Sequence, residues 1–426
     1  MSGAGRGPSA KLGAGRLSFL RSSGYATITA ASAVMLVALT MIAGRWLPAS
    51  EYGKFSFALA LATIVETLMD IGLGPVTVRT VARDGEGAGT LFRHVLGLKI
   101  AWGALGLVAL LVAAPLMRSD PTVIRACYLL GISSAIRSYV LSARGLLQGL
   151  NRFDLEAVTV VADRGLLLVL GTLVLVGGYG LYGLSLAFVA GRALMFVVVT
   201  AIVTHVTGSA VPTYDRAVWV ELQTAALPLG FFLITLTLYT YIDTVILGIM
   251  RTDAETGWYA ASYRVYEGLM YAPSAFATVL TPRFSQLFVD DPKGLRSLFQ
   301  RSLLGSAATA LVVGGVAMLL ARPMMLLFYG PAYAPAVAPL QVLAGGSIFV
   351  FCTWILHSAA IAINLDRRLV GTTAIGLVTN IGLNILFIPR LGITGAAWAT
   401  VIAEAVTVTL LYVQVQRRLR PAGQQA

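Results

Sequence analysis

The stretch ALPLGFFLITLTLYTYIDTVILG, residues 226–248, holds a single charged residue, Asp243, in 23 positions. A helix needs about 20 mainly apolar residues to cross the hydrocarbon core of a bilayer, so this run is long enough. Similar runs recur along the 426-residue chain, which is 57% hydrophobic and only 12% charged. Globular proteins carry about 25% charged residues. The sequence therefore predicts an all-α integral membrane protein.

About twelve apolar segments are predicted as membrane spans. They cover residues 24–44, 54–75, 95–117, 122–143, 158–178, 181–205, 221–250, 258–281, 298–320, 333–362, 369–388 and 394–416. With a cytoplasmic N-terminus, the inner segments hold 21 of the 31 Lys and Arg residues and the outer loops hold seven. Because Lys and Arg favour the cytoplasmic side, we expect both termini to be cytoplasmic. The net charge of +12 then reflects topology and anionic lipid and indicates no nucleic-acid partner.

The chain also resembles itself. Three pairs of similar strings occur in the same order at offsets of 204, 213 and 212 residues. They are GKFSFA from Gly53 with GWYAAS from Gly257, GLLQGLNRF (145–153) with AAIAINLDR (359–367), and GYGLYGLSLAFVAGR (178–192) with RLGITGAAWATVIAE (390–404). Six spans per repeat is an even number, so both halves have the same orientation. This predicts two parallel six-helix lobes related by an axis along the membrane normal.

The repeat predicts how the chain is divided. We expect a basic cytoplasmic tail, an N-lobe, a cytoplasmic linker, a C-lobe and a second basic tail, which cover residues 1–23, 24–206, 207–220, 221–416 and 417–426. Transporters with such lobes hold their substrate between them, and the lobes rock to open alternate sides of the membrane.

Four blocks form a recognisable pattern over nearly the whole chain after residue 24. They are LPASEYGKFSFALALATIVETLMDIGLGPVTVR (47–79), the stretch 226–248 quoted above, TGWYAASYRVYEGLMYAPSAFATVLTPRFSQLF (256–288), and LFYGPAYAPAVAPLQVLAG (327–345) leading into NIGLNILFIPRLGITGAAWATVIAE (380–404). This pattern resembles the polysaccharide transport family of the multidrug/oligosaccharidyl-lipid/polysaccharide (MOP) exporter superfamily.

The resemblance implies a MATE-like fold and a flippase of the O-antigen or exopolysaccharide type, not an enzyme. Such a protein moves a polyprenyl-diphosphate-linked oligosaccharide across the bacterial cytoplasmic (inner) membrane by alternating access. The implied partners are the lipid-linked glycan, membrane lipid and glycan polymerase or export machinery. No cofactor or metal is expected apart from a coupling ion, H⁺ or Na⁺.

Other functions stay open beside this one. They are an ion-coupled multidrug exporter of the same fold, a peptidoglycan-precursor (lipid II) flippase, and an integral-membrane glycan polymerase or ligase. A cavity for cationic drugs should be acidic or apolar, and three arginines within spans argue against it. A polymerase or ligase tends to carry a sizeable outer loop, whereas the outer loops here are short. The chain has no GxxxxGK[ST] motif, so ATP hydrolysis is not expected.

Arginines within spans are the predicted ligands of the diphosphate. Arg137, Arg192 and Arg264 lie at such positions, and guanidinium pairs with phosphate in a bidentate way. Alternatively, Arg137 extends toward the cytoplasmic surface. Four tyrosines are predicted to supply rings and hydroxyls to the sugars: Tyr239, Tyr241, Tyr263 and Tyr266.

Carboxylates within spans are costly and are the predicted sites of ion coupling or gating. They are Glu66, Asp70, Asp243, Glu267 and Glu404. Glu66 is favoured because it lies deepest and has no basic residue nearby on its own helix. Asp70 could instead pair with an arginine of the inner side. Asp243 could be a structural carboxylate that accepts hydrogen bonds from hydroxyl groups.

Two of these carboxylates have a possible arginine partner. Arg264 and Glu267 are three residues apart, a spacing at which opposite charges on a helix meet. Arg192 aligns with Glu404 in the repeat, so the two could form a latch between the lobes or have separate local partners. The sequence leaves both possibilities open.

Overall fold

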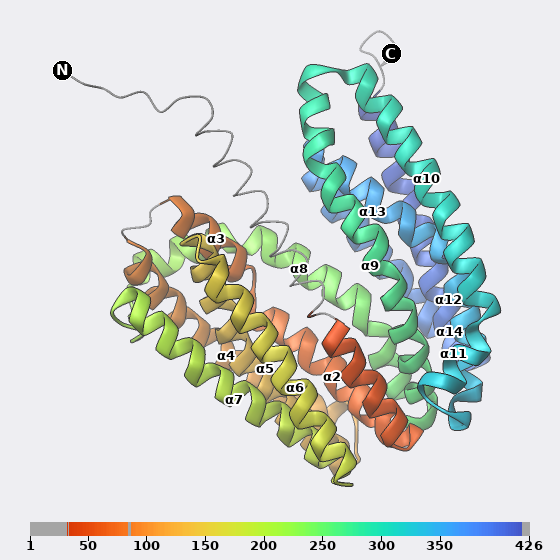
Figure 1. Cartoon of the computed structure of the whole chain (residues 1–426), viewed down its shortest axis with the longest axis horizontal. Helices are drawn as coiled ribbons and strands as arrows, with labels where there is room; N and C mark the ends of the chain where they lie inside the picture. Colours follow the sequence, from red (N-terminus) through yellow and green to blue (C-terminus); the bar gives the residue numbers. More distant parts are fainter. Residues whose placement is uncertain (1–31, 33, 84–86, 420–426) are drawn as a thin grey trace.

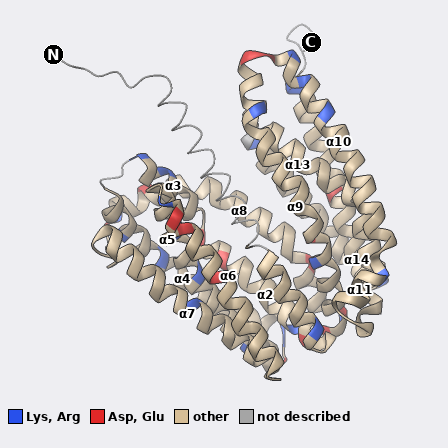
Figure 2. Ribbon diagram, viewed as in Figure 1, with Lys and Arg blue, Asp and Glu red and all other residues tan. Residues whose placement is uncertain are grey.

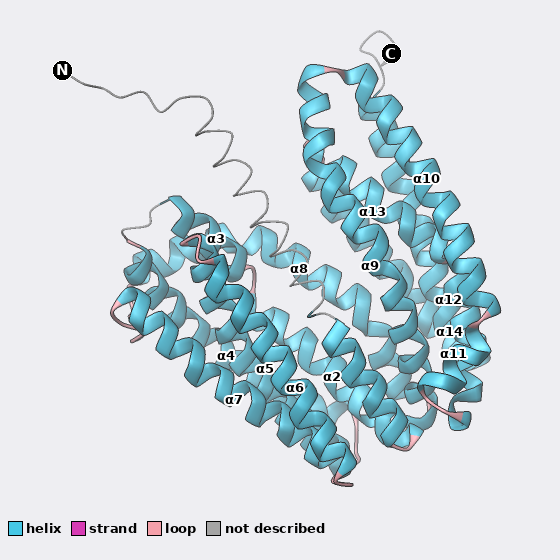
Figure 3. Ribbon diagram, in the orientation of Figure 1, coloured by secondary structure: helices cyan, strands magenta, loops and turns pink. Residues whose placement is uncertain are grey.

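The computed structural model describes residue 32 and residues 34–83 and 87–419, and in this part of the chain the regular structure is helical throughout (Figures 1 and 3). The expected all-α fold is confirmed. The expected tail 1–23, the start of the first expected span and residues 420–426 lie outside the described residues.

The first helices form what we call the N-terminal group. It consists of the helix Val34–Trp46, α2 (Ala49–Asp70), α3 (Leu73–Arg83), α4 (Ala88–Met117), α5 (Pro121–Gly149), α6 (Phe153–Val176) and α7 (Gly180–Thr207). A sharp turn separates α2 from α3, where Ile71 and Gly72 have φ angles of 40° and 82°. The following α5 begins with a cap, because Asp120 accepts a hydrogen bond from the Thr122 N–H at 2.8 Å.

The remaining helices form the C-terminal group. It consists of α8 (Arg216–Met250), α9 (Asp253–Asp290), α10 (Pro292–Leu319), α11 (Ala321–Phe328), η1 (Pro331–Ala336), α12 (Val337–Gly345), α13 (Ser347–Ala362) and α14 (Asp366–Leu419). Thr252 and Glu255 form a capping box at the start of α9. The last two expected spans both lie in α14, on either side of a break at Gly392, whose φ angle is 59°.

Eight helices of the described residues are long and apolar enough to cross a membrane. The segments Pro331–Gly345 and Ser347–Ala362, which meet at a bend of 44°, make nine if they are counted together as one span. Figure 2 shows long helical stretches without charge. The protein is thus a multi-pass membrane protein. The helix Val34–Trp46 is shorter, α9 is not among the eight, and α14 carries two expected spans. The count of twelve and the lobe boundaries therefore stay predictions.

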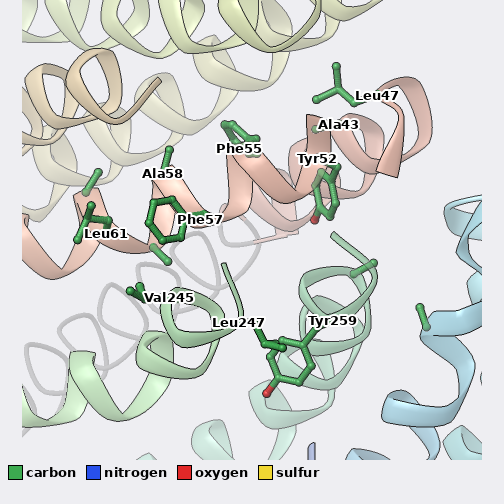
Figure 4. Packing of buried hydrophobic residues seen from close by; sticks show 14 of the residues in the cluster. Ala43, Leu47, Tyr52, Phe55, Phe57, Ala58, Leu61, Val245, Leu247 and Tyr259 are labelled. Atoms are coloured by element: carbon green, nitrogen blue, oxygen red, sulfur yellow. The ribbon is translucent and has the colours of Figure 1, made fainter. Parts of the chain in front are cut away.

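Helix α2 lies at the centre of the molecule, because it packs on α5 of its own group and on α8 and α9 of the other group. Figure 4 shows Phe57 and Leu61 of α2 facing the segment of α8 that carries Val245. All three side chains are buried. Away from this core, α9, α10 and α13 diverge from the N-terminal group toward the end where α9 passes into α10, whereas the first part of α8 stays packed on α3 and α4 (Figure 1).

The two helices that the sequence repeat equates, α2 and α9, cross at Gly53 and Gly257. A Cβ atom on Gly53 would lie 1.7 Å from the carbonyl oxygen of Asp253, and one on Gly257 would lie 2.1 Å from that of Ala49. Ala49 precedes Gly53 by four residues, as Asp253 precedes Gly257. The contact is therefore symmetric, which supports the parallel repeat.

The predicted orientation can be tested with two serine-to-cysteine substitutions. Ser50 at the start of α2 and Ser285 near the end of α9 are both exposed, and the native Cys127 and Cys352 are buried. We expect an impermeant thiol reagent to label Ser50→Cys in intact cells and Ser285→Cys only in inside-out vesicles. Because the reagent must reach the thiol through water, the reverse pattern would show that both termini lie outside.

Candidate functional site

A cavity of about 130 Å³ lies where the two helix groups meet, and we call it the arginine cavity. Its lining comes from the helix Val34–Trp46, α2, α5 and α7, and from one residue each of α8 and α9. It contains all three arginines predicted from the sequence, Arg137, Arg192 and Arg264, together with Glu66 and Tyr241. Helices far apart in the chain thus bring five predicted site residues together.

Arg137 on α5 faces Glu66 on α2. The Arg137 Nη1 atom donates to Glu66 Oε1 at 2.7 Å, and the two side chains are 32% and 8% exposed. The carboxylate is therefore buried and already neutralised by a cation. The partial exposure of Arg137 leaves guanidinium N–H groups that can bind a ligand, since arginine has five such donors.

Arg264 pairs with Glu267 on the same helix, as the three-residue spacing predicts. The Nη1 atom donates to Glu267 Oε2 at 2.5 Å. The Nε atom is buried and has no hydrogen-bond partner among the described residues. An unpaired buried donor is costly, so this arginine keeps hydrogen-bonding capacity that no described residue uses.

Arg192 belongs to a buried cluster that the sequence analysis missed. Its Nη1 atom donates to both carboxylate oxygens of Asp163 on α6. Arg144 on α5 reaches the same carboxylate at 3.0 Å. All three side chains are 7% exposed or less. One carboxylate thus neutralises two buried guanidinium groups, which makes Arg192 mainly a structural residue of the cavity wall.

The charges around the cavity do not cancel. The lining holds three arginines and one glutamate. With the direct partners Asp163, Glu267 and Arg144 included, four cations face three anions. Low-dielectric surroundings strengthen the field of such an excess charge. The cavity is therefore suited to an anion and not to a cationic compound.

Only one of the four predicted tyrosines lines the arginine cavity, namely Tyr241. The Tyr263 ring lies between those of Tyr259 and Tyr266, with centroid distances of 6.0 and 5.8 Å. Tyr266 is 1% exposed, so no sugar reaches it in this conformation. Tyr239 lies beside Gly376, inside the C-terminal group.

Asp70 is paired, but with a lysine and not with an arginine. Lys99 of α4 donates to Asp70 Oδ1 and, at 2.9 Å, to the Ser138 hydroxyl. The lysine side chain is 4% exposed. This pair joins α2, α4 and α5 and has the character of a structural contact.

Asp243 and Glu404 differ from Glu66 and Asp70, because neither forms any of the ion pairs found among the described residues. Asp243 accepts hydrogen bonds from the Tyr259 hydroxyl and from the Thr244 N–H at 2.7 Å. Glu404 accepts one from Thr353 at 2.9 Å. Both carboxylates are buried.

Arg192 and Glu404 therefore have separate local partners, Asp163 and Thr353. The latch between them that the repeat alignment left open is not formed in this conformation. Their equivalence in the repeat does not bring them together because each lies inside its own helix group.

The sequence also contains an indication that Asp163 is a site residue. It lies in VVADRGLLL (160–168), inside the expected span 158–178. The reasoning that singled out Asp243, a carboxylate among apolar neighbours, applies equally to this residue. Its two partners could not have been read from the sequence, because Arg144 and Arg192 lie 19 and 29 residues away on other helices.

The arrangement of the helices is the fold of transporters of the MOP superfamily. It is similar to a multidrug-resistance MATE family transporter in an inward-facing conformation, with a TM-score of 0.73, 15% identity and coverage of 91% of this chain and 94% of that one. It is also similar to the lipid II flippase MurJ in an inward closed conformation, with a TM-score of 0.70, 16% identity and coverage of 92% and 87%. At such identities the likeness concerns the fold.

Residues 20–288 match the family model described as polysaccharide biosynthesis protein, and the chain belongs to this family. Two relatives from Haloferax volcanii are also similar. One is the probable low-salt glycan biosynthesis flippase Agl15, with 27% identity over 40% of this chain and 37% of the relative. The other is the probable flippase AglR, with 31% identity over 39% and 35%. The matched region spans little more than a third of each relative.

Proposed function

We propose that this protein is a flippase for a polyprenyl-diphosphate-linked oligosaccharide, which it moves across a membrane by alternating access. The observation that supports this most is the arginine cavity at the junction of the two helix groups. Arg137 and Arg264 each contact a carboxylate through the Nη1 atom. The other N–H groups can then bind the two phosphates.

The size of the cavity indicates which part of the substrate it would hold. Typical small-molecule sites measure about 300–1,000 Å³, and the arginine cavity measures about 130 Å³. We expect it to hold the diphosphate, with the glycan in the wider space that opens as the helix groups move. The apolar surfaces of the spans leave the polyprenyl chain in the lipid.

The comparisons support the class of substrate. The family takes its description from polysaccharide biosynthesis, and both relatives are named as probable flippases. Both relatives come from Haloferax volcanii, and their names give neither a bacterial membrane nor a particular cargo. We therefore include three further points in the proposal: the bacterial cytoplasmic membrane, an O-antigen or exopolysaccharide cargo, and a partner polymerase or export complex. The positive cavity opposes the multidrug alternative, because cationic drugs favour acidic or apolar sites.

Deletion of the gene tests the proposal. We expect lipid-linked oligosaccharide to accumulate in the inner leaflet and the surface glycan to disappear, with both restored by the intact gene. Loss of drug resistance with unchanged glycan would favour the multidrug exporter. Arrested peptidoglycan synthesis would favour the lipid II flippase.

The contacts of the buried carboxylates favour other residues for ion coupling than the sequence does. Glu66, the favoured residue, and Asp70 are both ion-paired. Asp243 and Glu404 have only hydrogen bonds from neutral groups. A buried carboxylate without a cationic partner is costly as a bare anion, so it favours the binding of a proton or a sodium ion. We propose that these two residues couple transport to an ion gradient.

Glu404→Gln tests this coupling in proteoliposomes with an imposed proton or sodium gradient. We expect the variant to transport at the same rate with and without the gradient, because the amide binds neither ion as a carboxylate does. The matched control is Glu221→Gln, at an exposed position on α8, which should keep the full stimulation. Equal stimulation of the Glu404 variant and the control would remove Glu404 from the coupling mechanism.

A further inference from the structure

We propose that the crossing of α2 and α9 at Gly53 and Gly257, together with a clamp formed by Arg118, is a latch that closes one end of the transport pathway and opens once in each cycle. This inference rests on the proposed alternating access of a flippase. We call this end of the molecule the junction end, and define it by Gly53, Gly257, Arg118, Asp120 and Asp253.

The glycines allow a backbone contact that no other residue permits. A Cβ atom on Gly53 would lie 2.8 Å from the backbone nitrogen of Gly257, and one on Gly257 would lie 3.0 Å from that of Gly53. The first helical turns of α2 and α9 therefore touch directly. Because Ala49 and Asp253 are the other two residues in this contact, it involves equivalent positions of the two halves. The crossing therefore lies on the pseudo-two-fold axis that relates the two halves.

Arg118 stabilises the crossing of α2 and α9 through hydrogen bonds to the C-terminal group. It follows α4 in the N-terminal group and donates to Asp253 Oδ1 at 2.5 Å, at the start of α9. It also donates to the carbonyl oxygen of Gly248, near the end of α8. Such a carbonyl has no intrahelical partner. The guanidinium carbon lies 5.4 Å from the centre of the Phe57 ring. One residue of the N-terminal group thus holds two helix ends of the other group.

Lys54 of α2 adds a longer contact to Asp253 of the other group and is itself held by Asp120 of its own group. Its Nζ atom lies 2.6 Å from Asp120 and 3.9 Å from Asp253. The hydrogen bond from Lys54, with that from the Thr122 N–H, lowers the pKa of Asp120 to about 2. A depressed pKa means that this pair is intact above the ordinary pKa of about 3.9 and is lost only as the pH falls toward 2. At neutral pH Asp120 therefore holds Lys54 in place beside Asp253.

These polar contacts can open at small cost. The side chains of Lys54, Arg118 and Asp253 are between 14% and 21% exposed. Ion pairs with access to water contribute about 0–1 kcal/mol each, since water replaces the partner when they separate. The pair of Arg192 and Asp163, with side chains 6% and 3% exposed, has no such replacement. A gate needs a contact that fits closely when shut and whose polar groups are hydrated when it opens. The helix crossing with its ion pairs meets both conditions.

Gly257→Ala tests the latch without any substrate. The reporter is Thr63→Cys, which lines the arginine cavity, labelled by an impermeant reagent from the side on which Ser50→Cys reacts. Overpacking displaces helices, so we expect Gly257→Ala to raise this labelling about tenfold. The control is Gly268→Ala on the same helix, where an added Cβ meets nothing within 4 Å. Unchanged labelling of a folded Gly257→Ala protein would overturn the latch.

Arg118→Ala provides a second test in case the glycine variant does not fold. We expect the same rise in labelling of Thr63→Cys, with partial reversal by Arg118→Lys. The control Arg125→Ala removes an equal charge from an exposed position on α5 and should have no effect. The absence of a rise in Arg118→Ala would also count against the latch.

The labelling result and the transport result are independent. If labelling rises but the cargo is not a lipid-linked glycan, the latch stands and the proposed function fails. If labelling is unchanged while glycan export is confirmed, the proposed function stands and the latch fails.

Discussion

Arg264→Ala is expected to abolish glycan export while the protein still folds and inserts. The side chain lines the arginine cavity and has a buried Nε donor without a partner among the described residues. Removal of one charged partner from a buried phosphate contact typically costs about 2–5 kcal/mol, which is at least about thirtyfold in affinity. Export is measured as surface glycan, normalised to the amount of folded protein in the membrane.

The matched control is Arg251→Ala. Arg251 is also paired with a glutamate of α9, Glu255, at 2.8 Å, but it lies between α8 and α9 and does not line the cavity. Its loss should leave export nearly unchanged. Arg264→Lys should rescue only in part, because an ammonium group keeps the charge and loses the planar fork. Full export by Arg264→Ala would mean that the pair with Glu267 has only a structural role.

Asp163→Ala is expected to destabilise the protein by about 3–5 kcal/mol, the usual cost of breaking a buried ion pair by removing one partner. It would leave Arg144 and Arg192 buried without their shared carboxylate. Thermal unfolding of the detergent-solubilised protein, followed by size-exclusion chromatography, measures the effect. At a temperature at which the parent protein still elutes as a single monodisperse peak, the peak of the variant should have disappeared.

Asp154→Ala on the same helix is the control for this experiment. Asp154 pairs with Arg152 at 3.3 Å, and the side chains are 66% and 46% exposed. Exposed pairs contribute about 0–1 kcal/mol, so the control should unfold like the parent. Equal stability of the two variants would show that Asp163 is not needed to neutralise the arginines, and Arg192 would return as a direct ligand of the substrate.

The two experiments separate roles that the sequence could not separate. Arg192 and Arg264 both lie within apolar segments. The structure gives Arg192 an almost fully buried carboxylate from another helix, both of whose oxygens accept from Nη1, and gives Arg264 a local pair and an Nε donor without a partner among the described residues. Only the second arrangement leaves hydrogen-bonding capacity for a ligand.

The sequence by itself determined that the protein is a helical membrane protein, because the length and apolar character of its segments depend only on local composition. It also singled out all three arginines of the cavity, since a charge in a span is conspicuous without knowledge of its surroundings. The pair of Arg264 and Glu267 was open to prediction for a similar reason, as its geometry lies within one helical turn.

Only the tertiary structure decided which charges meet. Asp163 lies on α6 and its partners on α5 and α7, Glu66 and Arg137 are 71 residues apart, and Gly53 and Gly257 are 204 apart. In the same way, the structure separated Tyr241, which lines the cavity, from Tyr266, which is buried elsewhere. Such contacts depend on how helices cross and rotate against one another, and a local pattern of residues carries no information about either.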